Sequence, residues 1–144
     1  MDQHVRNNII NLVENSRDII VCSIDENGYP NAKAMFKMKN EGLRRFWFST
    51  NTSSIRTRHF LERPVACLYF VDHKDIHGLM LTGKMQVLTD NETKKAFWKE
   101  GDEKYYPLGP TDPDYCILLF TAEKGNYYHN LKKHIFSVDE LEGC

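Results

Sequence analysis

Residues 17–50, RDIIVCSIDENGYPNAKAMFKMKNEGLRRFWFST, decide the fold of this chain. The stretch contains three runs with the composition of β-strands, at residues 17–25, 31–39 and 43–50. The segments between them, ENGYP and NEG, hold Gly, Asn and Pro residues that favour turns. Three strand-like runs joined by such short turns predict an antiparallel meander.

Short helices are expected on both sides of this stretch. Apolar residues at helical spacing predict a helix over residues 3–15. Side chains that cap helices predict a second helix, which opens near Thr52 or Ser53 and ends before Pro64. The run NETKKAFWKEG (91–101), with a capping residue before it and a Gly at its end, predicts a third.

Further strands follow the second helix, and one of them alternates clearly. Strands are expected at residues 65–72 and 79–88. In the second of these, apolar and polar residues alternate, so that one face is buried and the other is wet. Gly83, on the apolar side, is expected to mark a bulge or a place where another group approaches the backbone closely. The buried face would carry Leu81, Gly83, Met85 and Val87, and the wet face Thr82, Lys84 and Gln86.

The last part of the chain completes the expected fold. Residues 115–122 predict a strand, and residues 123–130 a turn followed by another strand. The βαβ alternation of a parallel sheet is missing, which favours a mainly β fold: a small antiparallel β-barrel decorated with helices. Residues 1–144 form one expected domain, because the sequence contains no repeat and no linker.

Charge and leader signals limit the classes of function. The chain has 19 basic and 20 acidic residues and a net charge of -1, which disfavours binding to nucleic acid or to an anionic membrane surface. The N-terminus has neither a signal peptide pattern nor a long apolar stretch. A cytoplasmic location is therefore expected.

The four cysteines are Cys22, Cys67, Cys116 and Cys144, and they form no C-x-x-C pair. This spacing favours neither a zinc site nor a dithiol redox motif, and it agrees with a reducing compartment. The first three lie in apolar runs, where a thiol is expected to pack as a small core residue.

Three apparent motifs are interpreted as structural. GLMLTGKM (78–85) has the spacing of a phosphate loop, but Met85 stands where Ser or Thr would bind magnesium and the spacer is strand-like. His73 and His77 lie in a polar segment between two strands and have no third metal ligand nearby, so a hairpin loop is expected. No nucleophile elbow is present, and acyl transfer is unsupported.

The start of the second helix carries an unusual charge. STNTSSIRTRHFLER (49–63) places Arg56, Arg58 and His59 where the helix dipole favours acids. Free N–H groups, hydroxyls and guanidinium groups together form a good phosphate site. The alternative is a solvated basic face whose arginines pair with Glu41 or Glu62. These residues alone do not decide between the two interpretations.

A family resemblance favours the phosphate site. PNAKAMF (30–36), FWFSTNTSSIRT (46–57), LERPVACLYFVD (61–72) and LTGKMQVL (81–88) resemble, in order and spacing, the pyridoxamine 5'-phosphate oxidase-like family of FMN-binding split barrels. FWKEGDEKYYPLGPTDPDYCILLFT (97–121) is similar to the general stress protein branch of that family. The resemblance covers about residues 5–140. It implies a homodimer with FMN at the interface.

The resemblance also implies a set of cofactor-binding residues. A basic residue and a Ser with a second basic residue would hold the phosphate, two strands would border the flavin ring, and aromatic residues would face the flavin of the other subunit or pack in the interface. This chain departs from the family pattern at Ile55, where Arg58 is expected to compensate, and at Gly78, where the oxidases have Gln. The implied set is Lys33, Ala34, Met35, Phe48, Ser49, Thr50, Ser53, Ser54, Arg56, Trp98, Tyr106 and Tyr128, with His129 as a further aromatic candidate.

The functional expectation is an FMN-dependent oxidoreductase with a small-molecule electron donor or acceptor. The flavin performs the redox chemistry, so no catalytic side chain is assigned and no metal is expected. LKKHIFSVDELEGC (131–144) lacks the Trp and the Arg-His segment with which the oxidases bind pyridoxine phosphate, so vitamin B6 oxidation is not expected. The alternatives are a non-catalytic flavin-binding stress or sensor protein and a barrel for single-stranded nucleic acid, which the net charge disfavours.

Overall fold

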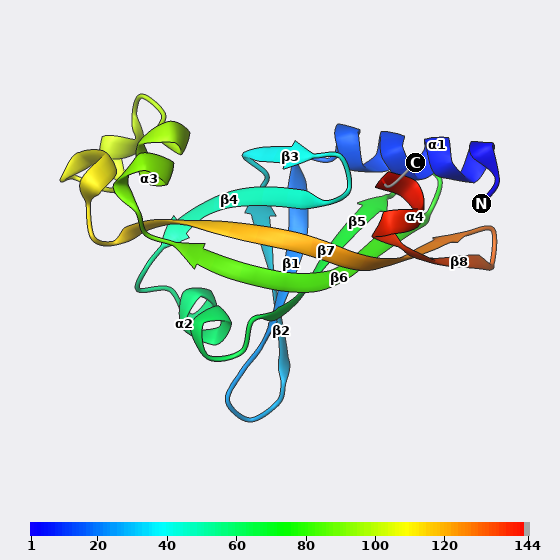
Figure 1. The fold of residues 1–144 in the computed structure, drawn as a ribbon, viewed down its shortest axis with the longest axis horizontal. Helices are drawn as coiled ribbons and strands as arrows, with labels where there is room; N and C mark the ends of the chain where they lie inside the picture. The colour runs from blue at the N-terminus through cyan, green and yellow to red at the C-terminus, as the bar shows by residue number, and fades with distance from the viewer. Residues whose placement is uncertain (143–144) are drawn as a thin grey trace.

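One antiparallel sheet of eight strands dominates the computed structural model, which describes residues 1–142 (Figure 1). Seven strands follow the order β2-β1-β5-β6-β7-β4-β3, and β8 pairs with the far half of β7. The strands are β1 (Asp18–Ile24), β2 (Pro30–Phe36), β3 (Lys39–Glu41), β4 (Arg45–Asn51), β5 (Val65–Asp72), β6 (His77–Leu88), β7 (Tyr115–His129) and β8 (Lys132–Ser137).

Four short α-helices cover the two ends of the sheet. α1 and α4 lie together at one end, where Arg6 donates a hydrogen bond to the carbonyl of Leu141, and α2 and α3 lie toward the other (Figure 1). The helices are α1 (Gln3–Asn15), α2 (Ile55–Glu62), α3 (Asn91–Phe97) and α4 (Val138–Glu142), and two 3-10 turns, η1 (Asp102–Lys104) and η2 (Gly109–Thr111), follow α3.

The predicted mainly antiparallel β architecture is confirmed, and so are most of the individual elements. α1 and β5 have the predicted bounds, and the polar segment with His73 forms the turn between β5 and β6. The predicted meander is wrong. β2 pairs with β1 alone, whereas β4 pairs along its whole length with β7. The short β3, in the expected turn, also pairs with β4.

β7 is longer than predicted. The turn expected within residues 123–130 does not exist, because the strand runs without interruption from Tyr115 to His129. Gly125 gives the segment its turn-like composition, but the glycine serves side-chain packing rather than a turn. A Cβ at this position would lie 2.3 Å from the ring of Phe136, so the glycine leaves room for that ring. The chain reverses one step later, at Asn130 and Leu131, which both have positive φ.

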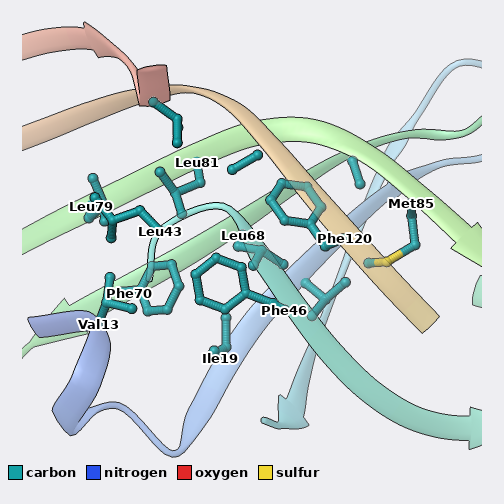
Figure 2. Close-up of a cluster of buried hydrophobic side chains, with 14 of the residues drawn as sticks. Val13, Ile19, Leu43, Phe46, Leu68, Phe70, Leu79, Leu81, Met85 and Phe120 are labelled. Carbon is teal, nitrogen blue, oxygen red and sulfur yellow. The ribbon is translucent and has the colours of Figure 1, made fainter. Parts of the chain in front are cut away.

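The core lies on the concave side of this sheet. Figure 2 shows that side chains from α1, β1, β4, β5, β6 and β7 meet there. The ring of Phe46 lies 5.6 Å from that of Phe70 and 6.2 Å from that of Phe120. The hydrophobic effect of burying such rings and their aliphatic neighbours is the dominant stabilising contribution in a domain of this size.

The alternation predicted for β6 is confirmed, and Gly83 marks the expected irregularity. Leu81, Gly83 and Met85 are buried, whereas Lys84 and Gln86 are exposed. The register between β6 and β7 shifts between Thr82 and Gly83. A Cβ at Gly83 would lie 2.0 Å from the carbonyl oxygen of Thr121, so only glycine fits.

The cysteines occupy two different environments. Cys116 is fully buried, as predicted. Cys22 and Cys67 are half-buried and lie directly opposite each other on β1 and β5, on the outward side of the sheet, so the prediction that they pack in the core is wrong. Cys144 lies outside the described residues. Within residues 1–142, no helix is both long and apolar enough to cross a membrane.

Candidate functional site

α2 begins at Ile55, slightly later than the predicted start near Thr52 or Ser53, and a side chain caps its N-terminus. Ser54 is the N-cap, and its hydroxyl accepts a hydrogen bond of 3.2 Å from the backbone N–H of Thr57. The hydroxyl of Thr57 donates to the carbonyl of Asn51 at 2.8 Å. Among the hydrogen bonds of residues 1–142, none uses the backbone N–H groups of Ile55 and Arg56. Two donors at the positive end of the helix dipole therefore remain available.

Arg56 is the basic residue that this helix end holds in place. Its Nη2 donates to the hydroxyl of Thr50 at 2.9 Å, while its Nε is buried without a hydrogen-bond partner. Within the described chain, no carboxylate forms an ion pair with it. Desolvation by burial lowers the pKa of the guanidinium, although it stays charged at neutral pH. A partly buried cation without a counter-ion is a favourable place for an anion.

Asp114 fixes the loop that precedes α2. Its carboxylate accepts hydrogen bonds from the backbone N–H of Ser53 at 2.9 Å and from the amide of Asn51 at 3.2 Å. These bonds lower the pKa of Asp114. Asp114 therefore engages both the side chain and the backbone N–H of Ser53. The buried hydroxyl of Thr52 lacks a hydrogen-bond partner, and the thiol of Cys116 lies beside it.

Lys33 lies on the same side of the β1–β2 pair as α2. On β1, Val21 and Ser23 face the concave side, and they pair with Lys33 and Asn31 of β2. His59 of α2 bonds to Ser23 on this side at 2.8 Å. Lys33 itself is exposed, so its ammonium group is free to move toward the helix end.

Arg58 does not share this position. It is exposed and stands two residues after Arg56, and side chains two apart on a helix point in nearly opposite directions. The alternative ion pairs are absent as well. Within residues 1–142, Glu62 pairs with Arg63 and Glu41 with Arg45 and Lys39, rather than with the arginines of α2.

The five residues expected beside a flavin ring have different environments. Ala34 is exposed and Ser49 is half-buried. Thr50 is buried and bonded to Arg56. Met35 and Phe48 are buried in the core, with 7% and 0% of their surface exposed. These last two therefore have only their backbone to offer to a ligand.

A second apolar cluster joins the loop after α3 to the start of β7. The ring of Trp98 lies 6.3 Å from Tyr106 and 5.2 Å from Tyr115, and Tyr106 and Tyr115 are 4.9 Å apart. Burial raises the pKa of Tyr115 to about 12, so its hydroxyl stays neutral and donates to the carbonyl of Lys94. Burial also raises the pKa of Tyr106, so its hydroxyl is neutral at neutral pH. Trp98 and Tyr106 thus pack together within one chain.

Tyr128 and His129 lie far from Arg56 in the same chain. They end β7, whereas the residues near Arg56 begin it, and the long strand separates α2 and α3 from β8 (Figure 1). Tyr128 is 48% exposed and pairs with Gly78. A Cβ at Gly78 would lie 2.2 Å from the hydroxyl of Tyr69. Tyr69 therefore fills the space that a side chain at position 78 would occupy.

His77, the first residue of β6, is the centre of a hydrogen-bond chain. His77 bonds to the hydroxyl of Tyr127 at 2.6 Å and contacts Asp72 at 3.3 Å. Over residues 1–142, no group of three or more His, Cys, Asp or Glu residues is arranged to hold a metal ion. The GLMLTGKM segment continues β6 as an ordinary strand rather than a phosphate loop.

The sequence pattern predicts the helix end but not all of the residues that support it. Asp114 comes from the loop before β7, and Thr52, expected only as a helix cap, has a buried hydroxyl; both shape the site. No local pattern connects Asp114 with Ser53, because the two residues are 61 positions apart.

The architecture is that of a split half-barrel with an anion-receptive helix end, and comparison with known proteins identifies the family. The family model described as pyridoxamine 5'-phosphate oxidase matches residues 7–129. The chain belongs to this family. Comparison with curated proteins finds no match.

Solved structures agree with this membership. A Clostridium acetobutylicum protein related to general stress protein 26 of B. subtilis is 46% identical, with a TM-score of 0.87 over 98% of this chain and 99% of that one. General stress protein 26 from Bacillus anthracis is 16% identical, with a TM-score of 0.71 over 92% and 99%. An FMN-binding protein of Nostoc punctiforme is 13% identical, with a TM-score of 0.66 over 93% and 91%. The last two share the fold alone.

Proposed function

We propose that the chain is a cytoplasmic, FMN-dependent oxidoreductase that works as a homodimer. The observation that carries this proposal is the environment of Arg56: a partly buried cation with an unpartnered Nε at the end of a capped helix. A phosphate monoester is the group that such a helix end accepts best, because the dipole, the free N–H groups and the guanidinium all favour a dianion.

The residues around Arg56 fit the phosphate of FMN. The N–H groups of Ile55 and Arg56, the hydroxyl of Thr52 and the guanidinium are donors without a full set of partners. Lys33 would add a second positive charge. The hydroxyl of Ser54 accepts from the backbone N–H of Thr57 and donates to the hydroxyl of Thr57 at 2.9 Å, because the proton of Thr57 goes to the carbonyl of Asn51. Ser54 therefore supports the site by capping the helix.

The neighbouring strands β2 and β4 would border the rest of the cofactor. Ala34, Ser49 and the backbone beside Met35 and Phe48 would border the ring system. When bound, the flavin supplies hydride and electron transfer with a small-molecule donor or acceptor. The chain itself binds the phosphate, orients the ring and keeps water away from one side of it.

A homodimer is proposed because the outward face of the sheet is apolar. Val65, Tyr69 and Val71 of β5 are 46%, 39% and 38% exposed. Ile20 and Cys22 of β1 continue this face, since they pair with Tyr69 and Cys67. Contiguous apolar surface of this kind is unusual on a monomer and is typical of an interface. A second copy on this face would also cover Tyr128, which lies on the same side.

The proposed function is tested by comparing FMN with riboflavin, which lacks the phosphate. Quenching of flavin fluorescence on titration gives the two Kd values, and FMN is expected to bind at least about 100-fold more tightly. Equal affinities would contradict the phosphate site. Anaerobic addition of NADH or NADPH to the FMN complex then follows the flavin absorbance. Bleaching, reversed by an electron acceptor, indicates an oxidoreductase, whereas an unchanged spectrum favours the non-catalytic sensor.

A further inference from the structure

Two cysteines that the proposed flavin site does not use face each other across the β1–β5 seam. Cys22 and Cys67 are paired residues in adjacent antiparallel strands, and they form the last pair of that ladder. Directly paired residues in antiparallel strands have Cα atoms about 4.5–5.5 Å apart, which is within the range that a disulfide requires. Both side chains lie on the outward side of the sheet, since residues that pair directly in antiparallel strands share one face.

Within one chain the pair is partly exposed, on the outward sheet face where the proposed homodimer interface would also lie. Both thiols are half-buried and line a shallow groove of about 300 Å³, whose other walls are apolar side chains. Burial and the neighbouring Cys22 raise the pKa of Cys67 to about 12, so this thiol is protonated at neutral pH. The raised pKa slows the reaction of Cys67 with an oxidant but does not prevent it.

We propose that Cys22 and Cys67 form a reversible intrachain disulfide when the chain meets a hydroperoxide. Two S–H bonds and the O–O bond of hydrogen peroxide break, and one S–S bond forms. The two electrons and two protons released by the thiols reduce the peroxide to two molecules of water. A dithiol reductant reverses the change by thiol–disulfide exchange.

The position of the pair gives this bond a structural consequence. α2 lies in the chain between β1 and β5, and Arg63, which follows the helix, donates to the carbonyl of Ile24 near the end of β1. A bond between Cys22 and Cys67 would join the end of β1 to the start of β5, the two segments that hold α2. Oxidation would therefore stabilise the fold around this helix.

The test is performed on a Cys144→Ser background, which removes the cysteine outside the described residues. The protein is incubated with hydrogen peroxide, remaining thiols are alkylated, and the intact mass and peptide map are measured. A mass loss of about 2 Da, with a linked peptide pair containing Cys22 and Cys67, is expected. Melting temperature should rise by roughly 5 °C, because the bond closes a long loop of the unfolded chain. Dithiothreitol should reverse both changes.

Matched variants separate the proposal from its alternatives. Cys116→Ser should behave like the parent, whereas Cys22→Ser and Cys67→Ser should lose both the mass change and the thermal shift. Full alkylation of Cys22 and Cys67 after peroxide treatment would overturn the proposal. A bond between two copies, visible as a dimer in a non-reducing gel, would overturn it too. None of these results depends on flavin binding, so the proposed function is tested separately.

Discussion

Ser23 of β1 and His59 of α2 form a buried hydrogen bond of 2.8 Å that fastens the helix to the sheet. Only 2% of the surface of Ser23 and 1% of that of His59 is exposed. A buried polar pair of this kind is costly to break from one side, because the remaining group has lost both water and its partner. The orientation of α2, and with it that of Arg56, depends on this contact.

Replacing Ser23→Ala should destabilise the fold by about 1–3 kcal/mol, because the ring nitrogen of His59 is left unpaired. Urea unfolding followed by tryptophan fluorescence measures the change. The exposed Thr89→Ala serves as control and should change stability by less than about 0.5 kcal/mol. Equal stability of Ser23→Ala and the parent would mean that water replaces the hydroxyl.

Replacing Arg56→Glu should weaken FMN binding by about 2–4 kcal/mol, or roughly 30- to 1000-fold in Kd, because repulsion replaces a charge-assisted contact. Arg58→Glu makes the same change of charge on the exposed side of the same helix and should have a much smaller effect. Fluorescence titration with FMN compares the two. Similar losses in both variants would indicate general electrostatic attraction rather than a phosphate site at Arg56.

Replacing Gly83→Ala should destabilise the fold by about 2–4 kcal/mol, because the added Cβ would lie 2.0 Å from the backbone oxygen of Thr121. Gly28→Ala is the matched control. Gly28 has a φ of 84° but open space around it, so only backbone strain of about 1 kcal/mol is expected. Thermal unfolding of both variants distinguishes close approach from strain, and equal losses would contradict the proposed crowding.

Replacing Asp114→Asn should make stability less sensitive to acid. Hydrogen bonds from Ser53 and Asn51 lower the folded-state pKa of Asp114 below its usual 3.8. A lowered folded-state pKa means that the ionised carboxylate stabilises the fold above about pH 4, and that this contribution disappears as the pH falls through the lowered value.

The measurement for Asp114→Asn is the free energy of unfolding at pH 6 and at pH 3. The difference between the two pH values should be smaller in Asp114→Asn than in the parent protein. Glu26→Gln, at an exposed turn, should retain the pH dependence of the parent. An unchanged difference in Asp114→Asn would show that the loop before α2 is held by other contacts.

Replacing Tyr69→Glu should convert the proposed homodimer to a monomer, because each copy would bring a carboxylate into an apolar interface. Size-exclusion chromatography with light scattering measures the mass. Ile10→Glu, which adds the same charge on the exposed side of α1, should leave the dimer intact. A dimeric Tyr69→Glu protein would place the interface on another face.

The sequence predicted elements well where local signals agree with the final packing. Periodicity and capping residues predicted α1 and β5 with correct bounds and α2 within a few residues. The pairing of strands was predicted less well. β4 leaves its neighbour in sequence and pairs with β7, a choice set by how the curved sheet closes around its core rather than by any local pattern.

Single glycine and cysteine residues also show that local sequence does not predict tertiary packing. The bulge or close approach expected at Gly83 is confirmed, whereas the turn expected within residues 123–130 is wrong, because Gly125 lies inside β7 next to the ring of Phe136. Cys22 and Cys67 lie in apolar runs that also describe an outward sheet face. An apolar run does not show whether a given side chain points into the core or onto an outward apolar face, so the side on which these cysteines lie could not be predicted.

The candidate site also combines residues that a local pattern predicts with residues that only the fold brings together. Ser54 and Arg56 belong to one short segment, and their pattern predicts the anion-receptive helix end. Asp114 reaches that end from the loop before β7, through contacts with residues far away in the sequence. Contacts of this kind become visible only in the folded structure.

The late position of β7 in the chain has a consequence for biosynthesis. β1 with β2 and β3 with β4 can form hairpins as soon as they leave the ribosome, but the other edges of β4 and β6 wait for a strand that begins only at Tyr115. Until then, apolar side chains and unpaired strand edges remain open to other nascent chains. Translation of the final strands thus determines when the molecule becomes protected from aggregation, and this delay favours chaperone contact during synthesis.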